Sequence, residues 1–223
     1  MPVQAIRGCL GLGMLLALGA LSLQAKVVAG GGALVTVSVY DDAKVGLEMM
    51  QRAEETATSV FQRAGIAVRW LNCSVDGELT HPKGPCGKAV YPTNLQVRIV
   101  RRARSLEPGV LGISYLSAEG IGCYSEVFVE PAENLSKTFR VTTASLLGHA
   151  AAHELAHLLL GTNSHTATGI MRARWQRQEL VTAGQGSLLF DRAEAQTMRE
   201  HLGSTAAGKT EEALVAGQRG GAW

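Results

Sequence analysis

The chain has 223 residues, of which 46% are hydrophobic and 18% charged. This is the size of one ordinary globular domain, and it is too apolar for wholesale disorder. The formal net charge of +2 gives no electrostatic case for binding nucleic acid. The 26 glycines and 6 prolines follow no collagen-like period, and no repeat of 20 to 50 residues is present, so collagen and solenoid architectures are excluded.

Residues 1–25 are typical of an export signal. Arg7 precedes an uncharged run from Gly8 to Leu23, and the small residue Ala25 follows that run. An uncleaved membrane anchor is the alternative, because the run is close to the shortest length that spans a bilayer, about 17 residues. We expect cleavage, and therefore a secreted or periplasmic protein.

A strand, a helix and a second strand are predicted at the start of the domain. Leu34 to Tyr40 alternates apolar and polar residues, as strands do. Asp41 and Asp42 can cap a helix that runs to about Ala64, since apolar residues recur there at three- and four-residue spacing. Ile66 to Leu71 forms the second strand, which should pair parallel to the first in a right-handed unit.

The cysteines agree with export. Cys73 and Cys86 flank a loop rich in proline and glycine, and in an oxidising compartment they are the natural disulfide pair. Cys123 is then unpaired. The alternative is a zinc knuckle formed by Cys73, His81 and Cys86, although no two of them have the tight spacing of structural zinc sites.

Three further strands are predicted in the middle of the chain. Residues 94–101 alternate apolar and polar side chains, and residues 111–116 form a short fourth strand. Residues 124–130 alternate charged residues with valine and phenylalanine and stop at Pro131. Charged side chains are typical of a strand at or near a sheet edge.

The Ala/Leu-rich stretch from Thr143 to Leu160 predicts a buried helix. Thr142 or Thr143 can cap its beginning, and Gly161 can end it. A last helix is predicted from Asp191 to Leu202.

These elements predict an α+β fold, in which a twisted mixed sheet packs on helices and a small irregular C-terminal subdomain follows. The domain should span residues 33–202. Residues 203–223 lose all periodicity and fill with glycine, alanine, threonine and charged residues, so we interpret them as a flexible tail.

The sequence HELAH within the buried helix contains the candidate metal ligands and the candidate general base. His153 and His157 are four residues apart, so both imidazoles lie on one helix face and can reach one metal ion. Glu154 beside them can contact a metal-bound water, as a general base must. The alternative is a structurally satisfied histidine pair in the core, which would require every buried imidazole to be paired. His149, one turn earlier, is expected to be a core or supporting residue.

The stretch HELAHLLLGTNSH, followed by GIM, resembles the metzincin branch of the zinc metalloproteases. In that family a glycine ends the active-site helix, a third histidine completes the zinc site, and a later methionine lies beneath the metal. The resemblance implies a zincin-like fold and one zinc ion. It implies the following roles: ligands His153, His157 and His165, base Glu154, turning residue Gly161 and floor Met171.

The spacing departs from the family pattern. Gly161 and His165 come four and eight residues after His157, where the family has three and six, so Asn163 occupies the family's ligand position. We favour His165, because imidazole is a far better zinc ligand than a neutral amide. No tyrosine closely follows Met171 to assist an oxyanion. Arg172 or Arg174 is the alternative, although exposed arginines after a turn are usually solvated.

The sequence therefore predicts an exported zinc metallopeptidase that acts on peptide or protein substrates, with no nucleic-acid partner and no membrane span after signal cleavage. Substrate is expected to lie extended along the strand of residues 124–130 and to add to the sheet edge. Two alternatives stay open. One is a small-molecule metallohydrolase with the same site, and the other is a non-catalytic zinc-binding protein in which Glu154 is idle.

Overall fold

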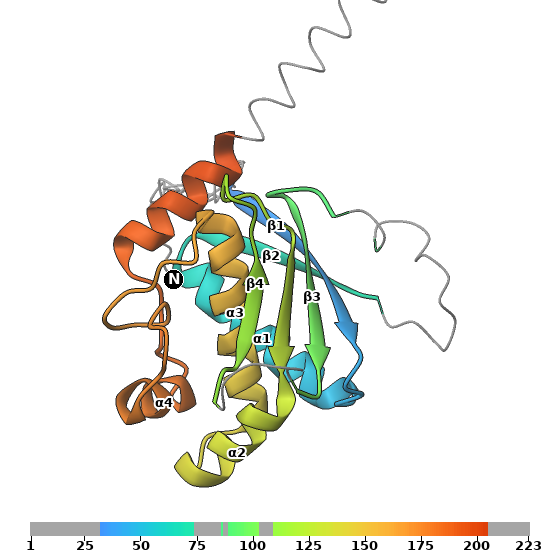
Figure 1. Ribbon diagram of the computed structural model, residues 1–223, viewed down its shortest axis with the longest axis vertical. Helices are drawn as coiled ribbons and strands as arrows, with labels where there is room; N and C mark the ends of the chain where they lie inside the picture. Colours follow the sequence, from blue (N-terminus) through green and yellow to red (C-terminus); the bar gives the residue numbers. More distant parts are fainter. Residues whose placement is uncertain (1–31, 74–85, 87–88, 103–108, 205–223) are drawn as a thin grey trace, which may run out of the picture. The chain divides into compact units, whose positions relative to one another are not determined.

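The computed structural model describes residues 32–73, 86, 89–102 and 109–204. They form a five-stranded mixed sheet with helices packed on it (Figure 1), so the α+β prediction is confirmed. The expected signal segment, residues 1–25, lies outside the described residues, and so do residues 205–223 of the expected tail; Gly203 and Ser204, the first two residues of that tail, belong to the last helix. The domain limits at residues 33 and 202 therefore stay predictions.

The first strand, helix and second strand form the expected parallel unit. β1 (Ala33–Asp41) pairs parallel to β2 (Ile66–Asn72), and α1 (Leu47–Arg63) connects them. The predicted cap of α1 is wrong, because the helix begins later, with Gly46 at the N-cap. The Asp41 carboxylate instead accepts hydrogen bonds from the backbone N–H groups of Val45 and Gly46, at 3.1 and 3.4 Å, and so closes the turn before the helix.

The strand order is β2-β1-β3-β5-β4. β3 (Asn94–Val100) is parallel to β1 and to β5 (Tyr124–Phe128), whereas β4 (Gly112–Tyr115) is antiparallel to β5. Residues 124–130 were expected at or near a sheet edge, and β5 lies near it: it is paired on both sides and is the neighbour of the edge strand β4. The short β4 is the edge strand on that side of the sheet, and β2 is the edge strand on the other side.

The end of β5 also differs from the prediction. Val129 and Glu130 begin α2 (Val129–Phe139), a helix that the sequence reading missed. Pro131 was interpreted as a strand stop. It lies in the first turn of α2, where the backbone N–H that proline lacks has no helical partner to lose.

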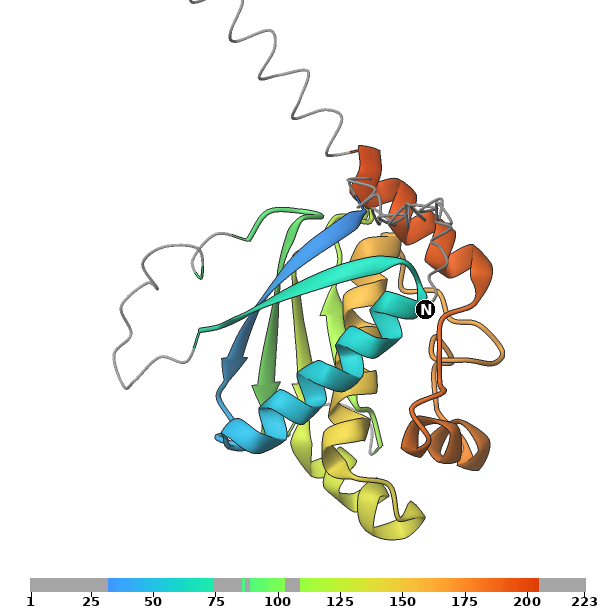
Figure 2. The same ribbon diagram turned by 180° about the vertical axis from the view of Figure 1, so that it is seen from behind.

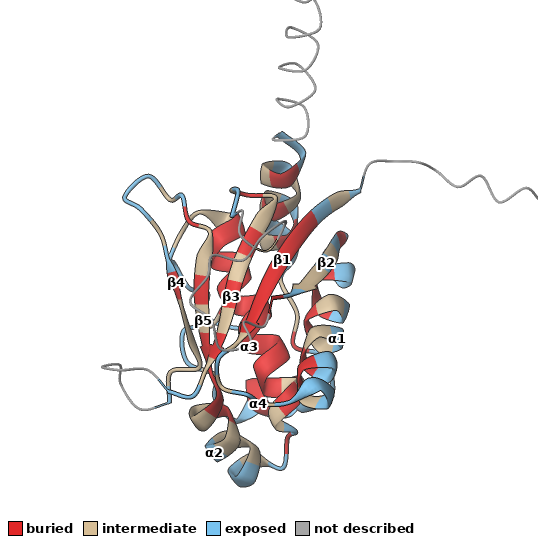
Figure 3. Ribbon diagram, turned by 90° about the vertical axis from the view of Figure 1, so that its right-hand side faces the viewer, coloured by how far each residue is buried: buried red, intermediate tan, exposed pale blue. Residues whose placement is uncertain are grey.

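α1 and α3 (Thr143–Leu160) cover one face of the sheet (Figure 2). Nearly every residue of α3 is buried, because the sheet and α1 enclose it (Figure 3). α1 and α3 pack closely at Gly148, where an added Cβ would lie 2.4 Å from the carbonyl oxygen of Ala53. The apolar core between these helices and the inner strand faces, including Val37, holds α3 in a fixed position.

The chain after α3 is irregular, as expected. It contains α4 (Arg177–Gly184), which was not predicted, and the described chain ends in the predicted last helix, residues 192–204. No helix among the described residues is long and apolar enough to cross a membrane.

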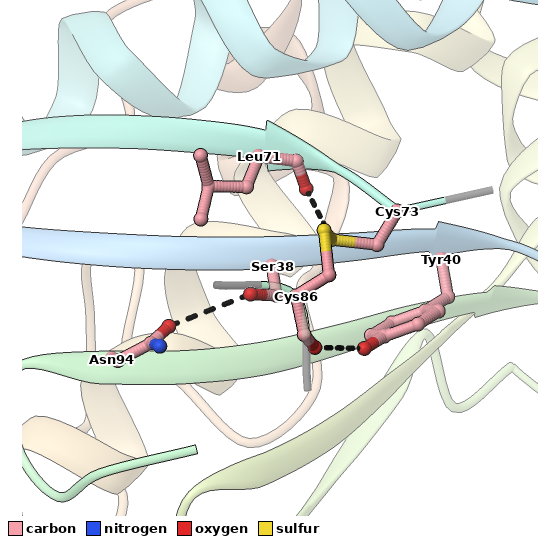
Figure 4. The surroundings of a disulfide bond; sticks show 6 residues. All are labelled: Ser38, Tyr40, Leu71, Cys73, Cys86 and Asn94. Atoms are coloured by element: carbon pink, nitrogen blue, oxygen red, sulfur yellow. Dashed lines mark hydrogen bonds between the residues drawn. A yellow bond between two sulfur atoms is a disulfide. The ribbon is translucent and has the colours of Figure 1, made fainter. Parts of the chain in front are cut away.

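The predicted disulfide between Cys73 and Cys86 is present (Figure 4), and Cys123 is a free thiol. The Tyr40 hydroxyl donates a hydrogen bond to the Cys86 carbonyl. The disulfide thus lies on the side of the sheet where Tyr40 projects, and its two cysteines are not available as ligands of the alternative zinc knuckle. His81, the third residue of that alternative, lies outside the described residues.

Candidate metal centre

α3 presents the HELAH residues because its two ends are fixed by local sequence. The Thr142 hydroxyl accepts a hydrogen bond from the Ser145 N–H at 3.1 Å, as an N-cap does. Gly161 ends the helix in the left-handed conformation, with φ 68°. A side chain there would also meet the carbonyl oxygen of Gly120, which is 3.0 Å from an ideal Cβ. The predicted limits of this helix are confirmed.

His153 and His157 project from one face of α3, and their Nε2 atoms are 3.0 Å apart. The other ring nitrogen of each is bonded to a backbone carbonyl. His153 Nδ1 lies 2.6 Å from the Ile170 oxygen, and His157 Nδ1 lies 2.8 Å from the Thr162 oxygen. A carbonyl can only accept, so each Nδ1 carries the proton and donates it.

The two Nε2 atoms therefore have no proton to share, and their lone pairs point toward one another. Burial, together with the neighbouring imidazole of His157, lowers the pKa of His153 to about 3, and burial also lowers the pKa of His157. Both rings are neutral at pH 7. Two facing lone pairs repel unless a cation lies between them, so this arrangement differs from the satisfied core pair that was the alternative.

His165 completes a cluster of three. One ligand atom from each of His153, His157 and His165 lies within 4.8 Å of the others. The His165 ring is exposed and stands 4.8 Å from the ring centre of His157. The partial burial of its ring lowers its pKa as well. Zinc–nitrogen bonds of about 2.0 to 2.1 Å in a tetrahedron place ligand atoms about 3.3 Å apart, so the trio fits one such ion after small side-chain movements.

Glu154 lies beside these histidines and is 6% exposed. The Ser114 hydroxyl is 2.7 Å from its Oε2 atom. Burial raises the pKa of Glu154 to about 7, and the hydrogen bond from Ser114 opposes part of that rise. A carboxyl group with this pKa can exchange protons near neutral pH, which general acid–base catalysis requires.

The edge strand β4 contributes two residues that the sequence reading missed. Gly112 and Ser114 are two positions apart, so they share one face of the strand. Ser114 holds the Glu154 carboxyl group, and Gly112 leaves room for it: an added Cβ would lie 2.5 Å from Glu154 Cγ. The alternation of strand faces links these two residues, but nothing local in the sequence connects them to Glu154, which is 40 positions further along.

The segment from Ile170 to Trp175, which follows the third histidine, contacts the site. The carbonyl oxygen of Ile170 accepts hydrogen bonds from His153 Nδ1 and, at 2.9 Å, from Trp175 Nε1. Met171, the expected floor, is 1% exposed and belongs to the apolar core. His149 is buried one turn before His153, bonded through Nδ1 to the Ser145 oxygen at 2.8 Å, and it is not part of the three-histidine cluster.

A cleft of about 380 Å³ opens onto the cluster. One wall is the edge strand with the residues that precede it, from Gly109 to Ser114, and the other wall runs from Arg172 to Trp175. Asn163 and His165 both line it. The expectation that Arg172 is a solvated charge is wrong, because its Nη1 atom forms a 3.0 Å ion pair with the buried Glu179.

The sequence matches no protein-family model and no curated protein sequence. Among solved structures, the chain is similar to a zinc-dependent peptidase from Methanocorpusculum labreanum, with 12% identity and a TM-score of 0.49 over 73% of this chain and 99% of that one. It is also similar to metalloproteinase-II from Bacteroides fragilis, with 13% identity and a TM-score of 0.42 over 75% of this chain and 52% of that one. The chain thus spans about half the length of the second protein.

Proposed function

We propose that this protein is a zinc-dependent peptidase in which His153, His157 and His165 hold one zinc ion and Glu154 is the general base. The observation that carries the proposal is the pair of unprotonated Nε2 atoms of His153 and His157, which converge at 3.0 Å. Their Nδ1–H groups are tied to backbone carbonyls, as metal-binding histidines usually are. Three neutral imidazoles are a donor set that suits zinc.

A bound zinc ion would supply a Lewis acid that polarises the scissile carbonyl and makes a neighbouring water acidic at neutral pH. Glu154 then takes the proton of the attacking water and passes it to the leaving amine. Ser114 orients the carboxyl group through its 2.7 Å hydrogen bond. The pKa of Glu154, which burial raises to about 7, suits both the uptake and the release of that proton.

The substrate is proposed to bind as an extended peptide along β4. The sheet order leaves the outer side of β4 without a partner strand among the described residues, and residues of β4 line the cleft. A peptide can add to such an edge through main-chain hydrogen bonds. This strand replaces residues 124–130 as the proposed substrate contact, because β5 has no open edge.

Export also remains part of the proposal. The Cys73–Cys86 disulfide supports it, since such bonds persist in oxidising compartments outside the cytoplasm. Cleavage of residues 1–25 is proposed from the sequence pattern alone.

The test is to measure the zinc content of the purified protein and its hydrolysis of one unstructured protein. One zinc per chain together with cleavage supports the peptidase. Zinc without cleavage of any peptide contradicts it and favours the small-molecule hydrolase or the non-catalytic zinc protein. Absence of bound zinc after incubation with a slight excess of the metal would contradict the site itself.

A further inference from the structure

The walls of the metal-site cleft include two arginine side chains. Among the described residues that line it, Arg172 and Arg174 are cations. Glu154 is the carboxylate among them, and it is buried and bonded to Ser114. A zinc ion held by neutral histidines would add two more positive charges. A cleft lined in this way attracts an anionic group.

Arg172 is held in a fixed position at this cleft. Its Nη1 atom lies 3.0 Å from Glu179 Oε1, and the other carboxylate oxygen, Oε2, accepts the backbone N–H of Gln176 at 2.9 Å. Glu179 is 5% exposed and lies in the first turn of α4. A buried carboxylate that is itself anchored to the backbone fixes the guanidinium that it binds, so little side-chain freedom is left to lose when a ligand binds.

The ion pair with Glu179 occupies one end of the guanidinium. An arginine has five N–H donors in a planar fork, and the ion pair with Glu179 uses Nη1. The Arg172 side chain is 27% exposed, and Arg172 is among the residues that line the cleft.

We propose that Arg172 recognises a carboxylate of the substrate, so that the protein prefers peptides that carry a carboxylate close to the scissile bond. The carboxylate belongs either to an acidic side chain or to the C-terminus of the peptide. Arg172 is then a specificity-determining residue, positioned by Glu179. This inference rests on the proposed peptidase function and names the substrate class of that same cleft.

The experiment uses the zinc-loaded full chain and blocked peptides in which Glu or Gln occupies, in turn, each of three positions on either side of the scissile bond. A second pair of peptides ends in a free carboxylate or in an amide. We expect one carboxylate position to raise kcat/KM at least about tenfold over its neutral isostere, which is the worth of one charge-assisted hydrogen bond. The two sets of peptides distinguish the acidic side chain from the terminal carboxylate.

The variant Arg172→Met should bring that ratio close to one and change the rate on the neutral peptide much less. Arg52→Met is the matched control, because it removes an exposed arginine of α1 that pairs with Glu48. It should leave the ratio unchanged. If Arg172→Met does not fold, Arg172→Lys decides, since a single ammonium cannot reproduce the fork and should lower the ratio.

Binding of the same peptides to zinc-loaded Glu154→Gln, measured by calorimetry, provides a readout that does not depend on turnover. The inference is supported if this variant binds the carboxylate peptides selectively and Arg172→Met abolishes that selectivity. This holds even if the wild-type protein hydrolyses no peptide, and in that case only the proposed function fails. Equal affinity and equal turnover for acidic and neutral peptides, or a preference that survives Arg172→Met, would overturn the assignment of Arg172.

Discussion

The variant Gly112→Ala tests whether the Glu154 carboxyl group lies where the mechanism needs it. An ideal Cβ on residue 112 would be 2.5 Å from Glu154 Cγ and 2.7 Å from its Oε1 atom. Carbon atoms in ordinary contact are about 3.5 Å apart, so the side chain must move by about 1 Å. The same Cβ would also lie 2.8 Å from the backbone oxygen of Glu126, so the backbone must adjust as well as the Glu154 side chain.

A displacement of this size has a calculable effect on catalysis. Misplacing a catalytic group by about 1 Å costs on the order of 10²-fold in rate, and overpacking costs about 1 to 3 kcal/mol in stability. We therefore expect Gly112→Ala to lose about 100-fold in kcat/KM while it retains one zinc, because the histidines are not displaced. The assay combines cleavage of a fluorogenic peptide with measurement of zinc content and thermal unfolding.

Gly203→Ala is the matched control, since an added Cβ at Gly203 meets nothing within 4 Å. It should leave both activity and zinc content unchanged. Full activity of folded Gly112→Ala would refute the reasoning, because the Glu154 carboxyl group would then not need the space beside β4. Loss of zinc would show instead that the change acts on the ligands.

Three further predictions concern the ligands and the cysteines. His165→Ala should greatly weaken zinc retention, whereas Asn163→Ala should leave the stoichiometry near one, because imidazole is the stronger ligand; zinc titration that gives the reverse result would place the third ligand at Asn163. Replacing Cys73 and Cys86 by alanine should lower the free energy of unfolding by about 3 kcal/mol in the chain-entropy model, as denaturant titration can measure; an unchanged free energy would contradict it. Burial raises the pKa of the Cys123 thiol, so its alkylation at pH 8 should be slower than that of an exposed cysteine in a peptide and should accelerate as the pH rises; a rate equal to the peptide's at pH 8 would contradict the burial.

The elements that could be predicted are those whose signals are local. Thr142 and Gly161 fixed the limits of α3, because both a cap and a left-handed C-terminal glycine act within a single turn. The four-residue spacing of His153 and His157 placed both rings on one face for the same reason. The disulfide followed from two cysteines that flank one loop.

The errors arose where pairing across the sheet decides the outcome. The alternation of charged and apolar residues in 124–130 indicated a strand. It could not show whether that strand has a partner strand on both sides, because this depends on where the four-residue β4 pairs in the sheet. A proline can end a strand and is also accepted in the first turn of a helix. Pro131 therefore could not show whether the chain continues as a loop or as a helix after the strand.

The contacts of Ser114 and Arg172 in the cleft could not be predicted from the sequence. Ser114 meets Glu154 40 positions away. The ion pair of Arg172 with Glu179 connects a turn to the first turn of a short helix that itself was not predicted. The hydrophobic periodicity of the sequence does not predict such contacts, because each contact forms only when the chain has folded.

The most direct test of the central claim is to compare Glu154→Gln with the wild-type protein in zinc content and peptide hydrolysis. The substitution preserves the size of the side chain and leaves all three histidines in place. If Glu154 is the general base, the variant should hold one zinc as the wild type does and lose about 10²- to 10⁴-fold in kcat. A variant that keeps full activity, or one that loses its zinc, would contradict the account.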